Sequence, residues 1–344
     1  MKAMLLRRIC DMRTEAAPLV LEEPPTPRPG SGQVLIRVSA CGVCHTELDI
    51  IEGRTPPPTL PVIPGHQVVG RVEETGPGVA DLKLGDRVGV AWIFSACGAC
   101  DHCREGRENL CPAFRATGRD ANGGYAEYMI VPAASAFRLP AVFTDFEAAP
   151  LLCAGAIGYR SLNLTGLENG RRLGLVGFGA SAHLVLKMVR HRFPNSAVFV
   201  WARSGREREF ARAIGAAWAG DLDAAPPAPM HAAIDTTPAW RPVLAALEHL
   251  APGGRLVINA IRKEAGDSSL LAGIDYPRHL WMEKEIKSVA NVTRRDVRAF
   301  IDLAATVPLK PAIECFPLAA ANQALMELKN RKIRGAKVLQ IDPG

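Results

Sequence analysis

Short apolar segments alternate with helical patterns along residues 170–293, and this alternation restricts the fold more than any other feature. Parallel strands need long crossover connections, which are usually helices, so the alternation predicts βαβ units and a parallel sheet. The expected strands are Leu173–Val176, Ala197–Trp201, Ala232–Asp235, Arg255–Asn259 and Ile286–Ala290. The expected helices are Ala180–Arg192, Arg206–Ile214 and Trp240–Leu250, the last closed by Pro252-Gly253-Gly254.

Residues 1–150 follow a different pattern. Strand-like segments such as Val34–Val38 and Val68–Val72 are separated by turn signals rich in Gly and Pro. This pattern predicts a mostly antiparallel β domain. Helical composition begins at Phe146–Ser161. A helix at Arg295–Ala305 and a strand at Lys337–Ile341 must then pack outside the parallel sheet.

The composition is that of an ordinary globular protein of about two domains. The chain has 344 residues, 48% apolar and 22% charged, which excludes a disordered chain, a collagen or a coiled coil. There are 41 basic and 35 acidic residues, a net charge of +6 without basic runs, so we expect neither nucleic-acid nor membrane partners. Charged residues interrupt the apolar N-terminus and the segment Leu173–Val189, so we expect no signal peptide or membrane span and a cytoplasmic location.

Four cysteines lie close together at Cys97, Cys100, Cys103 and Cys111. Four thiolates that converge in one loop form a closed tetrahedral site, which zinc accepts readily. The protein fills every ligand position, so this zinc would be structural. Disulfides and an iron–sulfur cluster are the alternatives, and the lack of a secretion signal weakens the first.

Three further residues form a second candidate metal site, namely Cys44, His66 and Cys153. Taken singly, a cysteine is more often a small core residue, and a histidine after Pro-Gly is more often a turn residue. Together they make a Cys2His set with an open fourth position, the arrangement of one class of catalytic zinc.

A glycine-rich turn, Gly177-Phe178-Gly179-Ala180-Ser181-Ala182, lies between an expected strand and an expected helix. Gly177 permits the tight turn, Gly179 permits the close approach of a pyrophosphate, and Ala182 is small enough for the helix to pack on the strand. The helix N-terminus offers N–H groups to the phosphates. The alternative is a strand–helix turn with incidental glycines.

In this order, the motifs resemble the zinc-dependent alcohol dehydrogenases of the medium-chain dehydrogenase/reductase family. The resemblance spans essentially the whole chain. Its landmarks are Cys44-His45-Thr46, Pro64-Gly65-His66, Gly85-Asp86-Arg87-Val88, the four-cysteine lobe, Gly123–Tyr128, Leu152–Gly155 and the glycine-rich turn.

The resemblance implies an α/β chain of two domains. A GroES-like, β-rich catalytic domain would comprise residues 1–154 and 294–344 and carry the structural zinc lobe at 95–113. A Rossmann nucleotide domain with a doubly wound parallel sheet would comprise residues 155–293. Family members usually form dimers or tetramers that pair through the nucleotide domain.

The resemblance also implies a role for each matching residue. Zinc would act as a Lewis acid on the alcohol oxygen, hydride would pass to the nicotinamide, and the alcohol proton would leave through Thr46. The implied zinc ligands are Cys44, His66 and Cys153, giving two zinc ions per chain with the cysteine lobe. His45 would meet the cofactor pyrophosphate, Glu47 would brace the histidine ligand, and Trp92 would line the substrate pocket.

Two positions near the zinc depart from the family pattern. Gln67 stands where many relatives have Glu, which removes a negative charge and would alter zinc exchange or electrophilicity. Asp49 stands where many have the His that ends the proton relay, so we expect a different pH profile. A basic stretch, Arg334-Gly335-Ala336-Lys337, matches the place where some relatives bind the pyrophosphate.

The end of the second nucleotide-domain strand predicts which cofactor is used. Members that prefer NAD place an acid there for the ribose 2′-hydroxyl. Here that position is Ala202, followed by Arg203, Ser204 and Arg206. Guanidinium and hydroxyl donors can bind a 2′-phosphate, so we expect NADP in preference to NAD. The alternative is that Arg203 stacks on adenine or is a solvated charge.

The expected function is hydride transfer between a nicotinamide cofactor and a primary alcohol or aldehyde, with aromatic ones among the substrates. A polyol or other secondary-alcohol dehydrogenase of the same family is the alternative among enzymes. A zinc-free quinone-reductase type is disfavoured by the intact set of Cys44, His66 and Cys153. A non-catalytic nucleotide-binding scaffold would bind one zinc, in the cysteine lobe, instead of two.

Overall fold

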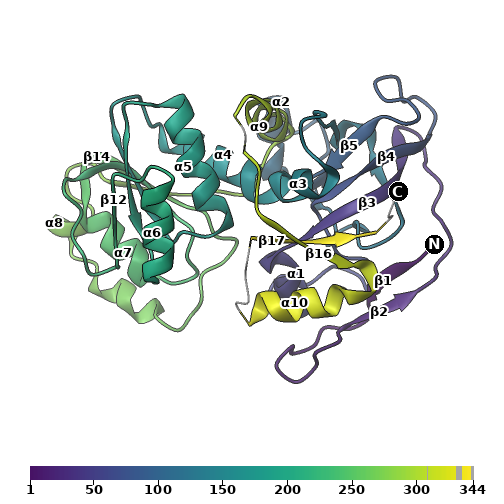
Figure 1. Ribbon diagram of the computed structural model, residues 1–344, viewed down its shortest axis with the longest axis horizontal. Helices are drawn as coiled ribbons and strands as arrows, with labels where there is room; N and C mark the ends of the chain where they lie inside the picture. The colour runs from purple at the N-terminus through teal and green to yellow at the C-terminus, as the bar shows by residue number, and fades with distance from the viewer. Residues whose placement is uncertain (308, 331–334, 342–344) are drawn as a thin grey trace. The chain divides into compact units, whose positions relative to one another are not determined.

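The computed structural model describes residues 1–307, 309–330 and 335–341 (Figure 1). The chain divides into two compact units. Unit 1 comprises Met1–Ala156 and Val292–Gly344, and unit 2 comprises Ile157–Asn291. The predicted fold class, a mixed α/β chain with a β-rich part and a parallel-sheet part, is confirmed. Within the described ranges, no helix has the length and apolar character needed to cross a bilayer.

Unit 1 is organised by a sheet with the strand order β16-β17-β3-β4-β5-β9, in which β8 also pairs with β3. All pairs are antiparallel except β16 with β17. In β3, Val34, Ile36 and Val38 are fully buried and point to the same face, as the period of two requires. Figure 1 shows the C-terminal strand β17 beside β3, so the C-terminal segment joins the sheet that residues 33–138 build.

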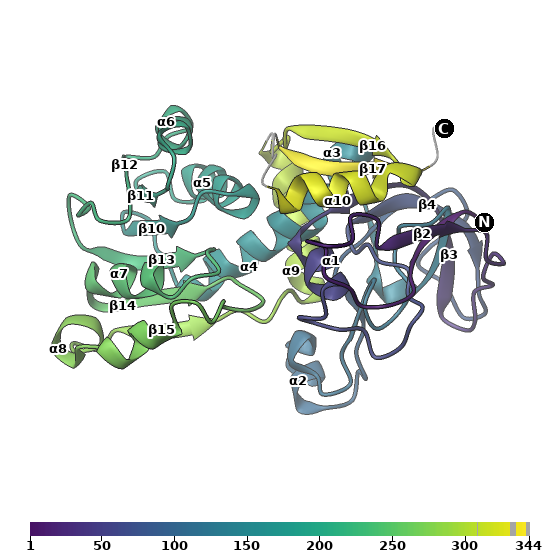
Figure 2. The same ribbon diagram turned by 90° about the horizontal axis from the view of Figure 1, so that it is seen from below.

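The helix α10 packs on this end of the sheet, against β16 and β17 (Figure 2). The strands of unit 1 are β1 (Ala3–Leu6), β2 (Leu19–Glu22), β3 (Gln33–Val43), β4 (Val68–Thr75), β5 (Arg87–Val90), β6 (Ile93–Ser95), β7 (Arg115–Ala116), β8 (Tyr128–Pro132), β9 (Ala136–Arg138), β16 (Ile313–Pro317) and β17 (Ala336–Gln340). Its helices are α1 (His45–Ile51), α2 (Asp101–Arg104), α3 (Asp145–Pro150), α9 (Arg294–Thr306) and α10 (Ala321–Lys329).

Unit 2 is a six-stranded sheet with the order β12-β11-β10-β13-β14-β15, and every neighbouring pair is parallel. The central strand β10 is buried along Leu173–Val176, as a strand covered on both faces must be. The strand order reverses between β10 and β13, which is the position where such sheets bind ligands at the carboxyl ends of their strands.

The strands of unit 2 are β10 (Arg172–Val176), β11 (Ala197–Trp201), β12 (Trp218–Gly220), β13 (Met230–Asp235), β14 (Leu250–Ile258) and β15 (Glu285–Ser288). Its helices are α5 (Ala180–Arg192), α6 (Gly205–Ala213), α7 (Arg241–Glu248) and α8 (Tyr276–His279), and α4 (Ala156–Thr165) begins at the last residue of unit 1. The three-residue strand β12 was not expected from the sequence, because it is too short to show a periodic pattern.

The prediction that Pro252-Gly253-Gly254 forms a turn before the strand is wrong, because these residues lie within a strand. The helix α7 ends at Glu248, and β14 already begins at Leu250 and includes these residues. Met230 of β13 pairs with Leu250 and Ala232 pairs with Arg255, so the intervening residues form an irregularity within the strand. Gly253, at φ 70°, provides the left-handed backbone that this requires.

The segment expected to be helical at Phe146–Ser161 is helical but not uniform. Between α3 and α4, residues Leu151–Gly155 form a π-helical turn. Such turns often occur at functional sites because the extra residue redirects a side chain. Here the turn carries Cys153.

Candidate active site

Cys44 lies where β3 ends and α1 begins. It is the N-cap residue of α1, with an extended backbone, and its sulfur accepts a hydrogen bond from the N–H of Thr46 at 3.3 Å. An N-cap side chain satisfies a helix N–H that has no partner inside the helix. The sulfur keeps further lone pairs beyond this bond, so it can also serve as a ligand.

Glu47 joins two of the predicted ligands. One carboxylate oxygen accepts the backbone N–H of Cys44 at 2.8 Å, which completes a capping box. The other oxygen lies 2.5 Å from Nδ1 of His66. Glu47 is fully buried, so both contacts form away from water. Holding the proton at Nδ1 leaves Nε2 of His66 as the lone-pair nitrogen.

His66 lies in the loop before β4 and is 1% exposed. Its Nε2 lies 3.8 Å from the sulfur of Cys44. Burial lowers the pKa of His66, but the charges of Glu47 and Cys44 outweigh this effect and raise it to about 10. The buried ring of Trp92 packs edge-on against the imidazole, with ring centroids 5.0 Å apart. The histidine is therefore held on two sides.

The structure brings Cys44, His66 and Cys153 together, with their ligand atoms all within 4.8 Å of one another. The hydrogen bond with Cys153, and then burial, raise the pKa of the Cys44 thiol well above its ordinary value, so ionising this thiol is costly. A divalent cation removes this cost. Two sulfurs and an oriented imidazole suit zinc, and three protein ligands leave its fourth position open.

Thr46 and Asp49 lie one turn apart on α1, the spacing that places side chains on one face. Thr46 is half-buried beside the Cys44 sulfur. Asp49 is buried, and its carboxylate accepts a hydrogen bond from Nε of Arg54 at 2.5 Å. Arg54 also pairs with Glu52. Arg54 was not singled out from the sequence, because nothing local distinguishes it from a surface arginine.

Gln67 follows His66 and is 3% exposed. Its backbone oxygen accepts the N–H of Gly42 at 3.0 Å. Its side-chain Nε2 has no hydrogen-bond partner in the part of the chain that the structure describes. Buried amide donors are satisfied by water or ligands when protein acceptors are lacking.

The four cysteines of the predicted lobe also converge, with sulfurs within 4.8 Å of one another. The backbone N–H groups of Ala99 and Cys100 point at the sulfur of Cys97, both at 3.4 Å, and lower the pKa of this thiol to about 6. Burial raises the pKa of Cys103 to about 12. All four are free thiols, which disfavours the disulfide alternative. A closed S4 cage of this kind fits zinc.

The glycine-rich turn of unit 2 connects β10 to α5 at the point where the strand order reverses. Gly177 has φ 82°, and a Cβ there would lie 2.7 Å from the hydroxyl of Thr236, so only glycine fits. Gly179 is exposed and is the N-cap residue of α5, and Ala182 is buried. The backbone N–H groups at the start of α5 are therefore available to an anion.

The loop after β11 carries the residues predicted to choose the cofactor. Ala202 is buried, and Arg203 and Ser204 are exposed. Ser204 is the N-cap residue of α6, where its hydroxyl accepts the N–H of Glu207 at 3.2 Å and keeps its hydrogen for another acceptor. Arg208 donates to the carbonyls of Ala202 at 2.8 Å and Arg203 at 2.9 Å.

Arg208 thus holds the shape of this loop, a role that sequence reasoning missed. Its position four residues after the capping serine was the available signal. His45, the other predicted cofactor residue, is exposed in the first turn of α1, in unit 1.

The C-terminal basic stretch does not offer free cations where the structure describes it. Lys337 is 2% exposed, and its ammonium donates to Glu314 at 2.7 Å and Glu327 at 2.6 Å. Its charge is neutralised there, so Lys337 offers no free cation to a pyrophosphate. Arg334 lies outside the described residues.

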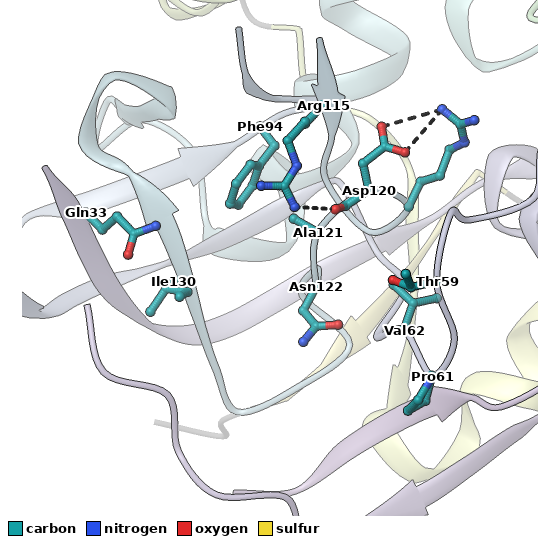
Figure 3. Close-up of a pocket in the computed structure, with 11 residues that line it drawn as sticks. Gln33, Thr59, Pro61, Val62, Phe94, Arg115, Asp120, Ala121, Asn122 and Ile130 are labelled. Carbon is teal, nitrogen blue, oxygen red and sulfur yellow. Dashed lines mark hydrogen bonds and ion pairs between the residues drawn. The ribbon is translucent and has the colours of Figure 1, made fainter. Parts of the chain in front are cut away.

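A separate hollow of about 360 Å³ lies on unit 1 (Figure 3). The guanidinium of Arg115 lies 5.4 Å from the ring centre of Phe94 and donates to the backbone oxygen of Asp120 at 2.5 Å. The Asp120 carboxylate pairs with Arg119. These cations are already partnered, and none of the predicted site residues lines the hollow.

Comparison with known proteins agrees with this geometry. Residues 30–141 match the family model of the alcohol dehydrogenase GroES-like domain. The chain is 44% identical to a probable alcohol dehydrogenase, AdhA, of Mycobacterium tuberculosis, over 99% of this chain and 97% of that protein.

Two solved structures are similar along the whole chain. A cobalt- and zinc-bound thermostable alcohol dehydrogenase from Pyrobaculum aerophilum has a TM-score of 0.86 at 27% identity, covering 99% of each chain. A cinnamyl alcohol dehydrogenase from Sorghum bicolor has a TM-score of 0.82 at 28% identity, covering 98% of this chain and 97% of that one. With its fold, its two convergent ligand groups and these relatives, this chain belongs to the zinc-type alcohol dehydrogenases of the medium-chain dehydrogenase/reductase family.

Proposed function

We propose that this alcohol dehydrogenase is zinc-dependent, prefers NADP(H), and interconverts primary alcohols and aldehydes, aromatic ones included. The observation that carries the proposal is the convergence of Cys44, His66 and Cys153. Zinc held by these residues would supply Lewis acidity toward an alcohol oxygen, and a nicotinamide would supply the hydride acceptor.

The remaining chemistry would fall to side chains of α1. Glu47 keeps the His66 imidazole in the tautomer that a metal requires. The hydroxyl of Thr46 would accept the alcohol proton, and Asp49 would pass it onward. Arg54, which donates to Asp49, would hold that carboxylate in place. Because Gln67 stands where many relatives have an acid, the surroundings of the zinc would carry one negative charge fewer.

Zinc content tests the two ligand groups separately. We expect about two zinc ions per chain in the wild type. The variant Cys153→Ser should lose one zinc and the activity, and Cys100→Ser should lose the other zinc. A wild type with a single zinc that Cys153→Ser retains would instead favour a non-catalytic scaffold.

The substrate class rests on one aromatic contact and on the name of one similar protein. Trp92 packs against His66 and would give the pocket an aromatic wall. The similar protein from Sorghum bicolor is named a cinnamyl alcohol dehydrogenase. A panel of benzylic, allylic, simple primary, secondary and polyol substrates should give the highest kcat/KM for an aromatic primary alcohol. Preference for a polyol or another secondary alcohol would favour the alternative.

The NADP preference rests on the loop after β11. Arg203 and the hydroxyl hydrogen of Ser204 would bind the 2′-phosphate, with Arg206 nearby and Arg208 shaping the loop. We expect a higher kcat/KM with NADP than with NAD, and a loss confined to NADP in Arg203→Ala. Arg171→Ala, an exposed arginine just before the amino end of β10, is the matched control. A wild-type preference for NAD would contradict this part of the proposal.

We also propose that the chain forms a homodimer or a homotetramer, with pairs of subunits joined through the edge strand β15. All four residues of β15 are exposed, including Ile286 at 45%, and the nearby Trp281 and Met282 are 53% and 51% exposed. Exposed apolar edges attract a second strand. Ile286→Lys should lower the mass measured by light scattering, whereas Leu84→Lys, at an exposed residue of unit 1, should not.

The free thiols of the cysteine lobe would suit a reducing compartment, so we propose a cytoplasmic location. Fractionation of the native source cells would test it.

A further inference from the structure

A buried ion pair joins the carboxyl ends of β13 and β14. Asp235 is the last residue of β13 and is fully buried, and Lys263 follows β14 with its side chain 8% exposed. The Lys263 ammonium donates to the Asp235 carboxylate and to the carbonyls of Thr237 at 2.8 Å and Ala239 at 2.9 Å. Three donors meet three acceptors, so the ammonium is fully satisfied.

Further bonds tie the same two segments together. The second carboxylate oxygen of Asp235 accepts the Thr237 hydroxyl at 2.7 Å. The Asp267 carboxylate accepts the N–H groups of Trp240 and Arg241, both at 2.8 Å. The N–H of Glu264 donates to the carbonyl of Pro238 at 2.7 Å. Residues 236–241 and 259–267 therefore form one cross-linked platform.

This platform adjoins the glycine-rich turn. The backbone N–H of Thr236 donates to the carbonyl of Val176 at 2.9 Å, and the Thr236 hydroxyl is the atom that a side chain at Gly177 would meet. The platform therefore lies on the β13 side of the point where the strand order reverses.

Its place determines which part of a dinucleotide it would touch. In such folds each half of the sheet takes one mononucleotide, and the acid that reads the adenosine ribose follows the second strand. That position here is Ala202, on the β10–β11–β12 half. The platform lies on the other half, β13–β14–β15, so it would contact the nicotinamide mononucleotide half of the cofactor.

A buried ion pair is weak evidence for a stabilising role, because apolar replacements often fold as well. Its distinctive contribution is geometric, since Lys263 binds atoms of three residues at once. We propose that Lys263 is a positioning residue for the cofactor: it sets the two loops that receive its nicotinamide half. This inference rests on the nicotinamide cofactor of the proposed function.

The test compares two ligands with the full-length protein. Reduced dinucleotide, followed by its fluorescence, reports both halves. Adenosine 2′,5′-bisphosphate reports the adenine half alone, with AMP in its place if the wild type prefers NAD. The variants are Lys263→Met, which cannot donate, and the double variant Lys263→Met/Asp235→Asn, which leaves no unpaired buried charge.

Both variants should raise the Kd of the reduced dinucleotide at least about tenfold and leave that of the adenine-half ligand within about twofold. Lys284→Met is the matched control, because Lys284 also binds two carbonyls, of Leu247 and Arg278, but lies before the amino end of β15. It should change neither Kd.

Equal losses for both ligands would mean that the pair only stabilises the unit, and unchanged binding of both would mean that the platform is not used. Recovery of dinucleotide binding in the double variant would assign the effect to the unpaired carboxylate, and each of these three results overturns the inference. Failure of the wild type to bind any nicotinamide dinucleotide would instead overturn the proposed function.

Discussion

Replacing Glu47 with Gln tests whether one buried carboxylate holds the catalytic ligand set together. In the wild type its two oxygens accept the N–H of Cys44 at 2.8 Å and contact Nδ1 of His66 at 2.5 Å. An amide of the same shape keeps one acceptor, but its NH2 group must face one of the two donors. One ligand therefore loses its bond and meets a donor instead.

The expected magnitude follows from the number and kind of bonds lost. A hydrogen bond to a charged group contributes about 1.5–3 kcal/mol, and Glu47 is fully buried, so little solvent screening reduces this. Loss of a carboxylate that orients a metal-binding histidine weakens metal binding about 10–100-fold. That range corresponds to about 1.4–2.8 kcal/mol, in agreement with the first estimate.

Zinc transfer to a colorimetric chelator measures the effect. The wild type should release its two zinc ions in separate phases, and Glu47→Gln should accelerate only the phase assigned to the Cys153 site. The cysteine-lobe phase is the internal standard. Glu147→Gln is the matched control, since Glu147 completes the capping box of α3 in the same way but contacts no candidate ligand. Unchanged release, or equal acceleration of both phases, would refute the reasoning.

Three further outcomes are expected. Asp49→Asn should slow alcohol oxidation mainly below pH 8, and an unchanged pH–rate profile would rule out a relay role for the carboxylate that Arg54 holds. Ser204→Ala removes the N-cap of α6 and should cost about 1 kcal/mol in urea unfolding, while raising the KM for NADP more than that for alcohol. A hydrogen bond from the backbone N–H of Lys83, and then one from the Arg138 side chain, lower the pKa of the Asp86 carboxyl. Asp86→Asn should therefore lower the free energy of unfolding at neutral pH. The difference from the wild type should shrink as pH falls below about 4, because the wild-type carboxyl then also protonates. A difference that persisted in acid would contradict this.

Local spacing was sufficient for part of this protein. The four lobe cysteines lie between positions 97 and 111, so any loop that closes on itself brings their sulfurs together. The glycine-rich turn and the exact span of α5, Ala180–Arg192, also follow from neighbouring residues, because turn chemistry and helical periodicity act over a few positions.

Residues distant in sequence met only through the tertiary structure. Cys153 lies near Cys44 and His66, in a π-helical turn that interrupts the expected helix. No local sequence pattern predicts that turn. The cross-link of Lys263 to Asp235 likewise depends on β13 and β14 lying side by side. The sequence by itself determined which residues can bind metal and cofactor, whereas packing decided which of them share a site, since burial and distance are set by contacts between elements rather than by order along the chain.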